Sequence, residues 1–159
     1  MKYGLIALCL GLLLMVALPA RAFCFEAAGA RYRIDPRLLK AIAMQESGLN
    51  PKAINVNRDK SGRPLSTDYG VMQINSVHIP GLIRMGIIKR PEDLLTNPCL
   101  NVQTGAWILA KHLQVCGVNW GCLGSYNAGL TDNKRQEARR MQYARRIYGI
   151  YMKMVRGDA

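Results

Sequence analysis

The 159-residue sequence lacks the features that would divide it into several domains, and it has no apolar run of full membrane-spanning length. It has no internal repeat, no low-complexity stretch and no long linker, so we expect one domain with one hydrophobic core. The apolar run from Gly4 to Leu18 is shorter than the roughly 20 residues that a membrane-spanning helix needs. Half of the residues are apolar and 20% are charged, which excludes a disordered chain.

The N-terminus has the three parts of a secretory signal peptide. A short basic start, Met1 to Tyr3, precedes the apolar run, and Pro19-Ala20-Arg21-Ala22 ends in small residues at the two positions that a signal peptidase reads. We therefore expect residues 1–22 to be a signal peptide cleaved after Ala22, and a periplasmic domain of residues 23–159. An uncleaved membrane anchor is the alternative.

Acidic residues are scarce, since 10 Asp and Glu stand against 22 Lys and Arg. Cleavage would remove Lys2 and Arg21 and no acid, which leaves 20 basic residues and a net charge of +10. Such a charge favours polyanionic partners, although it can also serve solubility alone. For an exported monomer, the cell wall or a membrane surface fits better than nucleic acid. We expect no nucleic-acid partner, and salt-sensitive DNA binding would contradict this.

Histidine is rare and no Cys-x-x-Cys spacing occurs. His78 and His112 stand apart, so we expect no metal site and no cofactor. Loss of Cys9 with the signal peptide would leave four cysteines, an even number that indicates disulfides in an exported chain. Three pairings are possible. We favour Cys116–Cys122, which closes a short loop, and Cys24–Cys99, which ties the N-terminus to a distant helix.

Turn-forming residues fill one long stretch, Asn50 to Ser66, which we expect to be a loop or a β-hairpin. Most of the remaining chain has apolar residues at helical spacing. The clearest helix has Asp35 as its cap, Pro36 at its first position and Gly48 as its stop. Residues 68–76 should be extended or turn into a helix. Further helices are expected at 23–32, around Pro80 and Pro91, from Asn97-Pro98, and from Asp132 or Asn133 to about Val155. Residues 120–126 are a short apolar segment closed by Asn127 and Gly129.

The last of these helices is strongly basic. Its apolar stripe consists of Tyr143, Ile147, Ile150 and Met154, and the arginines around it are Arg139, Arg140, Arg145 and Arg146. A charged run of this kind is usually a solvated helix face. Contact with a wall polymer or a partner protein is the alternative.

Glu46 occupies a position where an apolar residue is expected. Helical spacing puts it on the same stripe as Leu39, Ile42 and Ala43. Burial of an unpaired carboxylate is costly, and it raises the pKa because it disfavours the charged form. A carboxyl that is protonated near neutral pH can donate a proton to a leaving oxygen. An ordinary glutamate at a helix end is the alternative, and the motifs that accompany Glu46 argue against it.

Three short motifs occur in the order typical of one enzyme family. Glu46-Ser47 matches the catalytic E-S pair of the SLT-type lytic transglycosylases, Gly70-Val71-Met72-Gln73 resembles their G-L-M-Q motif, and Ser125-Tyr126-Asn127-Ala128-Gly129 resembles their A-Y-N-x-G motif. The segment 66–76 also resembles the strand of animal-type lysozymes that carries their second catalytic carboxylate. The resemblance spans about residues 24–130, and it is strongest to the small transglycosylases that accompany secretion, conjugation and pilus machines.

The resemblance implies a mainly α, lysozyme-like fold of the α+β type, with a helical lobe and a small hairpin or loop lobe flanking a substrate cleft. It implies that Glu46 is the catalytic acid and base, and that Asp68 assists it by electrostatics. A turn or capping role is the alternative for Asp68. The family's substrate-binding positions correspond to Ser47, Met72, Gln73, Tyr126 and Asn127. For Met72 and Tyr126 the alternative is core packing, and for Asn127 it is shaping a turn.

The implied function is peptidoglycan cleavage at the bond between N-acetylmuramic acid and N-acetylglucosamine, with a 1,6-anhydro product. Local wall opening for a transenvelope machine would make components of that machine the protein partners. A lysozyme-type hydrolase is the nearest alternative, and Asp68 favours it. A non-catalytic assembly factor that binds glycan is the alternative of another class, and Glu46 argues against it.

Overall fold

The structure is a computed structural model that describes residues 23–158. The signal peptide expected at residues 1–22, including Cys9, lies outside this range. The helices are α1 (Phe25–Tyr32), α2 (Pro36–Ser47), α3 (Ile79–Arg84), α4 (Asp93–Thr96), α5 (Pro98–Cys116), α6 (Trp120–Leu123), α7 (Ser125–Ala128) and α8 (Lys134–Arg156), with a 3-10 turn, η1 (Ser76–His78). The strands are β1 (Ile54–Arg58), β2 (Pro64–Tyr69) and β3 (Ile74–Asn75).

Local sequence signals set the ends of the long helices. The Asp35 side chain accepts a hydrogen bond from Arg37 N at 2.8 Å, and α2 ends at Gly48 with a φ of 61°. Asn97 caps α5 and Asn133 caps α8 in the same way. These boundaries confirm the predicted helices. The apolar segment 120–126 contains α6 and the start of α7.

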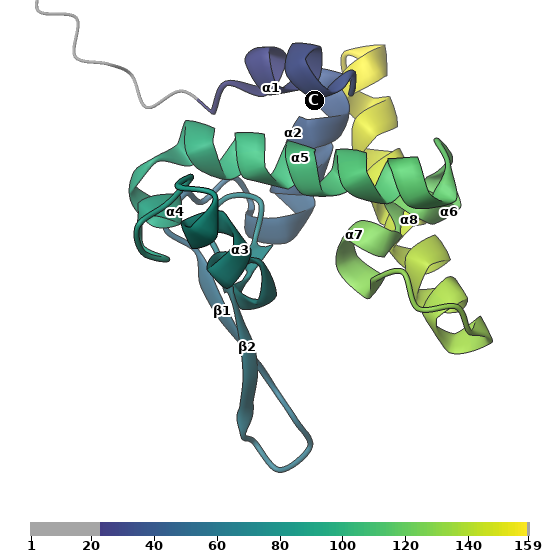
Figure 1. Cartoon of the computed structure of the whole chain (residues 1–159). Coiled ribbons are helices and arrows are strands. Elements are labelled where there is room, and N and C mark those ends of the chain that lie inside the picture. The colour runs from purple at the N-terminus through teal and green to yellow at the C-terminus, as the bar shows by residue number, and fades with distance from the viewer. Residues whose placement is uncertain (1–22, 159) are drawn as a thin grey trace, which may run out of the picture.

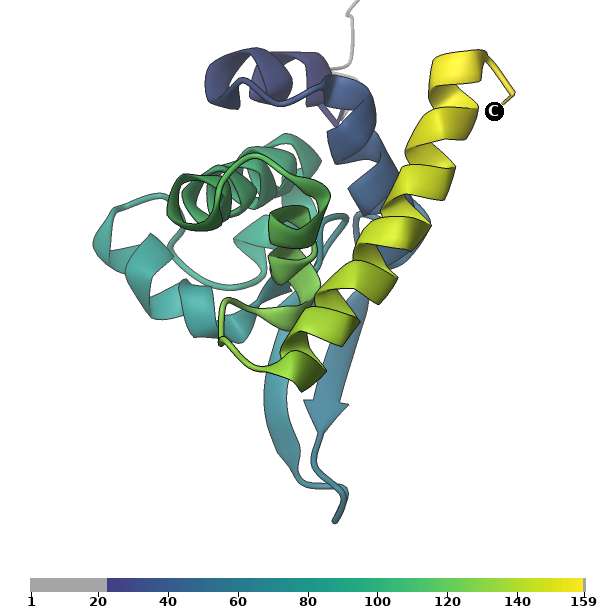
Figure 2. The same ribbon diagram turned by 90° about the vertical axis from the view of Figure 1, so that its right-hand side faces the viewer.

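Helix α5 runs through the middle of the molecule and the other helices pack around it (Figure 1). Its Gly105 allows a close approach, because a Cβ there would lie 2.9 Å from both Met72 and the Tyr126 hydroxyl. Helix α8 crosses the molecule diagonally and packs against α2 (Figure 2). The fully buried residues include Leu39, Ile42, Met72, Leu82, Leu94, Val102, Leu109 and Ile147.

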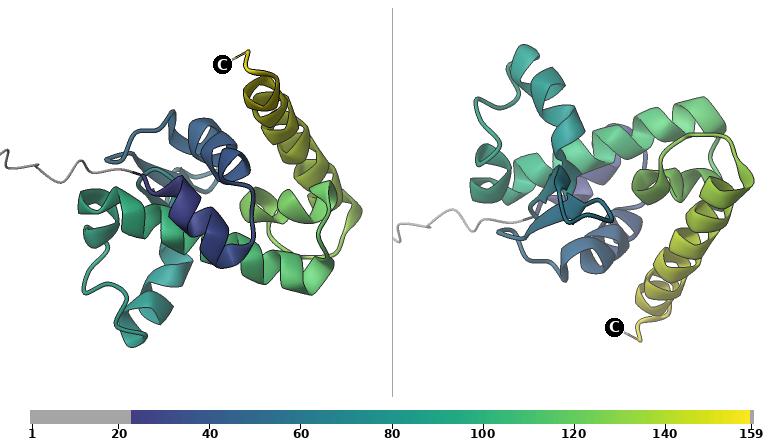
Figure 3. Two further views of the ribbon diagram at one scale, coloured as in Figure 1. Left: turned by 90° about the horizontal axis from the view of Figure 1, so that it is seen from above. Right: turned by 90° about the horizontal axis from the view of Figure 1, so that it is seen from below.

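The polar stretch after α2 forms the antiparallel hairpin of β1 and β2, and β3 adds to β2. The hairpin projects from the end of the molecule opposite α1 (Figure 1), and in the view from below it points towards the reader (Figure 3). This mainly helical fold with a small antiparallel sheet confirms the expected fold class. None of the helices within residues 23–158 combines the length and the apolarity required to cross a membrane.

Two disulfides lie at the two ends of α5. Cys24 is joined to Cys99, and Cys116 is joined to Cys122. These are the two pairs favoured from the sequence. The first ties the start of α1 to the first turn of α5, and the second closes the loop that leads into α6.

Candidate active site

Glu46 lies near the C-terminal end of α2, at the contact between α2 and α8. Its side chain is half-buried and shares a helix face with Leu39, Ile42 and Ala43, which are fully buried. The hydroxyl of Tyr143 on α8 donates a hydrogen bond to Glu46 Oε1. The carboxyl is therefore held between two helices with one fixed donor.

Burial raises the pKa of Glu46 from 4.5 to about 7. The Tyr143 hydrogen bond opposes this rise because it favours the carboxylate. The negative charge of Asp68 raises the pKa further, and the positive charge of Arg146 lowers it. A pKa near 7 leaves a large fraction of the carboxyl protonated at neutral pH, so the group can both donate and accept a proton.

Tyr143 is a site residue that the sequence analysis assigned only to the apolar stripe of the last helix. It is 1% exposed, and burial raises its pKa well above the usual value, so the hydroxyl keeps its proton and remains a donor. A buried tyrosine normally finds a partner for its hydroxyl. That rule predicts a polar partner for Tyr143 but does not identify it as Glu46.

Asp68 lies on β2 in a polar setting. Its two carboxylate oxygens accept hydrogen bonds from Asn57 Nδ2 and Asn75 Nδ2, both at 2.7 Å. The same two amides also donate to Ser66 Oγ at 3.0 Å. In the strand register, Asn57 lies opposite Ser66, and Asp68 lies opposite Asn75. The four side chains of this network therefore share one face of the sheet. The carboxylate is thus fixed by neutral donors on both sides.

The turn between β2 and β3 is held by buried side chains from three helices. Asn101 on α5 accepts from Met72 N at 2.8 Å and donates to Tyr69 O at 2.8 Å. Ser47 Oγ donates to Val71 O at 2.8 Å, and the Tyr126 hydroxyl donates to Met72 O at 2.8 Å. The turn is therefore fixed relative to α2, where Glu46 lies. Asn101 was not anticipated from the sequence, because nothing local distinguishes it from a surface asparagine.

The predicted substrate-binding residues occupy different environments. Tyr126 lies close enough to Glu46 for the carboxylate charge, together with burial, to raise its pKa. Gln73 adopts a left-handed φ of 49° and donates from Nε2 to Gly70 O at 2.9 Å. Met72 was expected to bind substrate, but its side chain is fully buried and packs against Gly105. Asn127 is exposed on α7.

Across residues 23–158, no three or more His, Cys, Asp or Glu side chains gather in a way that could hold a metal ion. His112 instead shares a hydrogen bond between Nδ1 and Ser125 Oγ at 2.8 Å. The Tyr143 hydroxyl bonds to Glu46, and the charges of Asp68 and Arg146 act on its carboxyl.

Comparison with known proteins identifies the family of this chain. The model of the transglycosylase SLT domain matches residues 23–148, a range that includes Glu46, Asp68 and Tyr143. A "peptidoglycan-binding-like protein" of Escherichia coli O157:H7 is 51% identical over 136 residues, 85% of this chain and 80% of that protein. Protein IpgF of Shigella flexneri is 42% identical over 84% of this chain and 82% of its own. "Invasion protein IagB" of Salmonella typhimurium is 43% identical over 85% of this chain and 79% of its own. The chain belongs to the transglycosylase SLT domain family.

Proposed function

We propose that the protein is a peptidoglycan lytic transglycosylase in which Glu46 acts as both acid and base. The observation that carries this proposal is the half-buried Glu46 carboxyl, with its pKa raised to about 7 and its position fixed by Tyr143. A glycosidic oxygen needs a proton donor, and a C6 hydroxyl needs a proton acceptor. A single carboxyl with a pKa near neutrality can serve in both steps.

In the first step, Glu46 gives its proton to the oxygen between N-acetylmuramic acid and N-acetylglucosamine, and the bond to the muramic anomeric carbon breaks. Positive charge then develops on the muramic ring. In the second step, the Glu46 carboxylate takes the proton of the ring's own C6 hydroxyl, and that oxygen bonds to the anomeric carbon. The 1,6-anhydro product forms without water, and Glu46 returns to its protonated form.

Asp68 is proposed to stabilise the developing positive charge. Its carboxylate is held by Asn57 and Asn75 and interacts electrostatically with Glu46. The glycan strand would then pass between the hairpin that carries Asp68 and the helices that carry Glu46 and Tyr126. Ser47 and Gln73 would act mainly by holding this region in shape, since both side chains bond to backbone oxygens.

A lysozyme-type hydrolase is the second candidate, and the fixed Asp68 carboxylate favours it. The two reactions differ in the oxygen that bonds to the anomeric carbon. In the transglycosylase it is the C6 oxygen of the same sugar, and in the hydrolase it is the oxygen of water. The anhydro product is lighter than the hydrolysed product by one water. Product mass therefore separates the two candidates directly.

The proposed setting is the periplasm, where the chain would open the wall locally for a transenvelope secretion, conjugation or pilus machine. The substrate of this family lies outside the cytoplasm, and the expected signal peptide fits export. One relative, "Invasion protein IagB", is named for a role in invasion, which is compatible with work beside such a machine. Peptidoglycan strands are the proposed substrate, and components of such a machine are the proposed partners.

The test uses purified residues 23–159 and isolated peptidoglycan, with mass spectrometry of the released fragments. Wild type should release 1,6-anhydro muropeptides, and Glu46→Gln should reduce the rate by about 10²–10⁴, the usual worth of a catalytic acid. Glu137→Gln, at an exposed position on α8, is the matched control and should behave as wild type. Release of no muropeptides by wild type, with or without a partner machine, would contradict the proposal. Full biological activity of Glu46→Gln would instead favour a non-catalytic role.

A further inference from the structure

An exposed apolar surface lies around Trp120, at the junction of α6 and α8. Two hollows flank the indole, one of about 410 Å³ and one of about 290 Å³. We call this surface the Trp120 face. Its lining residues are Leu38, Leu113, Val118, Asn119, Trp120 and Leu123 in the larger hollow, and Trp120, Met141, Ala144, Arg145 and Tyr148 in the smaller.

The Trp120 face is rigid. The Cys116–Cys122 disulfide closes the loop that presents Val118 and Trp120, and Asn119 caps α6 with a 2.8 Å hydrogen bond to Cys122 N. The indole packs edge-on against the ring of Tyr148, with centroids 5.0 Å apart. Because the disulfide and the cap restrict the backbone of this loop, a partner that binds it loses less backbone entropy than with an unconstrained loop.

The same side chains remain open to solvent. Val118 is 89% exposed, Tyr148 48% and Trp120 36%. A contiguous exposed apolar surface of this kind marks an interaction site more often than a single exposed residue does. Tryptophan, tyrosine and arginine are also the residues that dominate binding energy at protein interfaces. These features indicate a surface that a partner covers.

The chemistry of the hollows favours a protein segment over a glycan. Most of the lining atoms belong to aliphatic and aromatic side chains, and the polar side chains are those of Asn119 and Arg145. A sugar chain carries many hydroxyls that need hydrogen-bonding partners, and these hollows offer few. Leucine-like or aromatic side chains of a partner would fill them without leaving polar groups unpaired.

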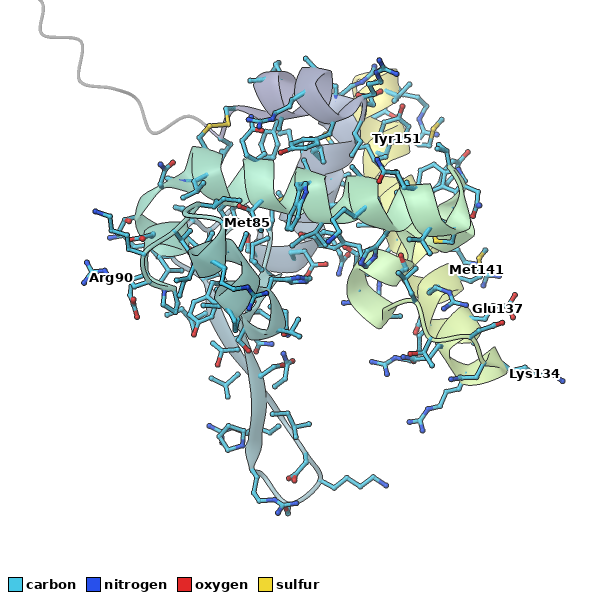
Figure 4. The ribbon with its side chains drawn as sticks, viewed as in Figure 1. Met85, Arg90, Lys134, Glu137, Met141 and Tyr151 are labelled. Atoms are coloured by element: carbon cyan, nitrogen blue, oxygen red, sulfur yellow. A yellow bond between two sulfur atoms is a disulfide. The ribbon has the colours of Figure 1, made fainter. Side chains whose placement is uncertain are left out.

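The charge around the face selects an acidic partner. Arg145 is the charged residue among those that line the two hollows, and within residues 23–158 no ion pair joins it to a carboxylate, whereas Arg37 beside the Tyr151 ring is paired with Asp35 at 2.8 Å. Met141, which lines the smaller hollow, and Tyr151 both lie on α8 (Figure 4). A second copy would bring Arg145 and a net charge of +10 against the same charges, which opposes self-association.

The Trp120 face is separate from the candidate active site. Tyr143 points from α8 towards Glu46, whereas Met141 and Arg145 are two residues away on either side, about 200° around the helix. A partner on the Trp120 face would therefore leave Glu46 uncovered.

We propose that the Trp120 face docks an acidic segment of another protein, whose apolar side chains fill the two hollows beside Trp120. The surface would hold the protein at its place of action while Glu46 remains accessible. The proposal does not depend on the reaction assigned to Glu46.

Fluorescence provides the test, because the sequence contains two tryptophans, Trp107 and Trp120. In a Trp107→Phe background, Trp120 alone reports on the face. The probes are two synthetic amphipathic peptides that share a leucine face, one with glutamates on its polar face and the other with lysines. The glutamate peptide should shift the Trp120 emission to shorter wavelength, and the lysine peptide should bind at least about tenfold more weakly.

Arg145→Glu and Tyr148→Ala should each weaken binding of the glutamate peptide by about tenfold or more, as expected of interface anchors. Ile83→Ala, at a 43% exposed apolar position on α3, is the matched control and should bind as the parent does. A circular dichroism spectrum and a thermal unfolding midpoint like those of the parent would show that Arg145→Glu is folded. The proposal is overturned if the glutamate peptide causes no shift, or if Arg145→Glu binds it as tightly as the parent.

A photoreactive phenylalanine at position 118, in the bacterium that makes the protein, identifies the natural occupant. The expected crosslinked peptide comes from another protein and contains acidic and apolar residues. Crosslinks confined to glycan or to a second copy would overturn the proposal. A yield no higher than that from position 83 would do so too.

Discussion

The two carboxyls of the candidate active site have opposite surroundings. Glu46 comes from the helical part of the molecule, where burial raises its pKa to about 7 and one tyrosine hydroxyl bonds to it. Asp68 comes from the hairpin, where two asparagine amides bond to its oxygens. An apolar setting favours a protonated acid, and a polar setting with several donors favours a fixed negative charge. The difference assigns proton transfer to Glu46 and electrostatic support to Asp68.

Asp68→Asn removes the negative charge but keeps the size of the side chain. We expect the rate of peptidoglycan cleavage to fall by about 10²-fold, because charge stabilisation in the transition state is typically worth that much. The pKa of Glu46 should also fall, since the Asp68 charge raises it. The pH–rate profile measures both effects. Asp132→Asn, at an exposed position, is the control, and an unchanged profile in Asp68→Asn would leave Glu46 as the sole catalytic carboxyl.

Glu46→Gln should change the pH dependence of stability. The folded carboxyl has a pKa of about 7 against an ordinary value of 4.5, so the folded state binds more protons than the unfolded state between these values. The contribution of Glu46 to wild-type stability should therefore fall as pH rises from about 4.5 to above 7. After allowance for partial exposure, the loss is about 2 kcal/mol.

The glutamine variant has no titrating group at position 46 and escapes this loss. Chemical denaturation at pH 4 and pH 8 should show Glu46→Gln gaining about 2 kcal/mol on wild type across that range. Glu137→Gln should gain nothing. Parallel behaviour of wild type and Glu46→Gln would mean that Glu46 is as well hydrated in the folded protein as in the unfolded chain.

Tyr143→Phe removes the one hydrogen bond that favours the Glu46 carboxylate while it keeps the ring in the core. We expect the pKa of Glu46 to rise, because the hydrogen bond that favours its carboxylate is lost. The falling limb of activity should move to higher pH by the same amount, and the maximal rate should fall about tenfold as the carboxyl loses its fixed orientation. Tyr148→Phe is the matched control on the opposite face of α8. A lower maximal rate with an unmoved limb would indicate a purely structural role.

Local patterns predicted the parts of the fold that depend on neighbouring residues. The Asp35 cap, the Gly48 stop and the hairpin stretch after Asn50 follow from turn and capping chemistry that acts over a few positions. The helical stripe that contains Glu46 likewise predicted its burial. Each of these depends on residues close together in the chain.

Contacts between distant segments could not be predicted in this way. Tyr143 and Glu46 are 97 residues apart, and Asn101 and Met72 are 29 apart. Their spacing carries no signal of pairing, because the pairing depends on how α8 and α5 pack. Family resemblance assigned Met72 to substrate binding, yet its side chain is fully buried and the neighbouring helices hold its backbone.

The smallest expected effect concerns the asparagines that hold Asp68. Asn75→Ala leaves the Asp68 charge in place and removes one of its two amide donors. We expect the cleavage rate to fall about fivefold, the worth of roughly 1 kcal/mol for one hydrogen bond. Asn55→Ala is the control, since its amide bonds to Asn57 at 3.4 Å and not to Asp68. If the Asp68→Asn background abolishes the effect of Asn75→Ala, the asparagine acts through the carboxylate. If the two losses multiply independently, Asn75 serves the hairpin alone.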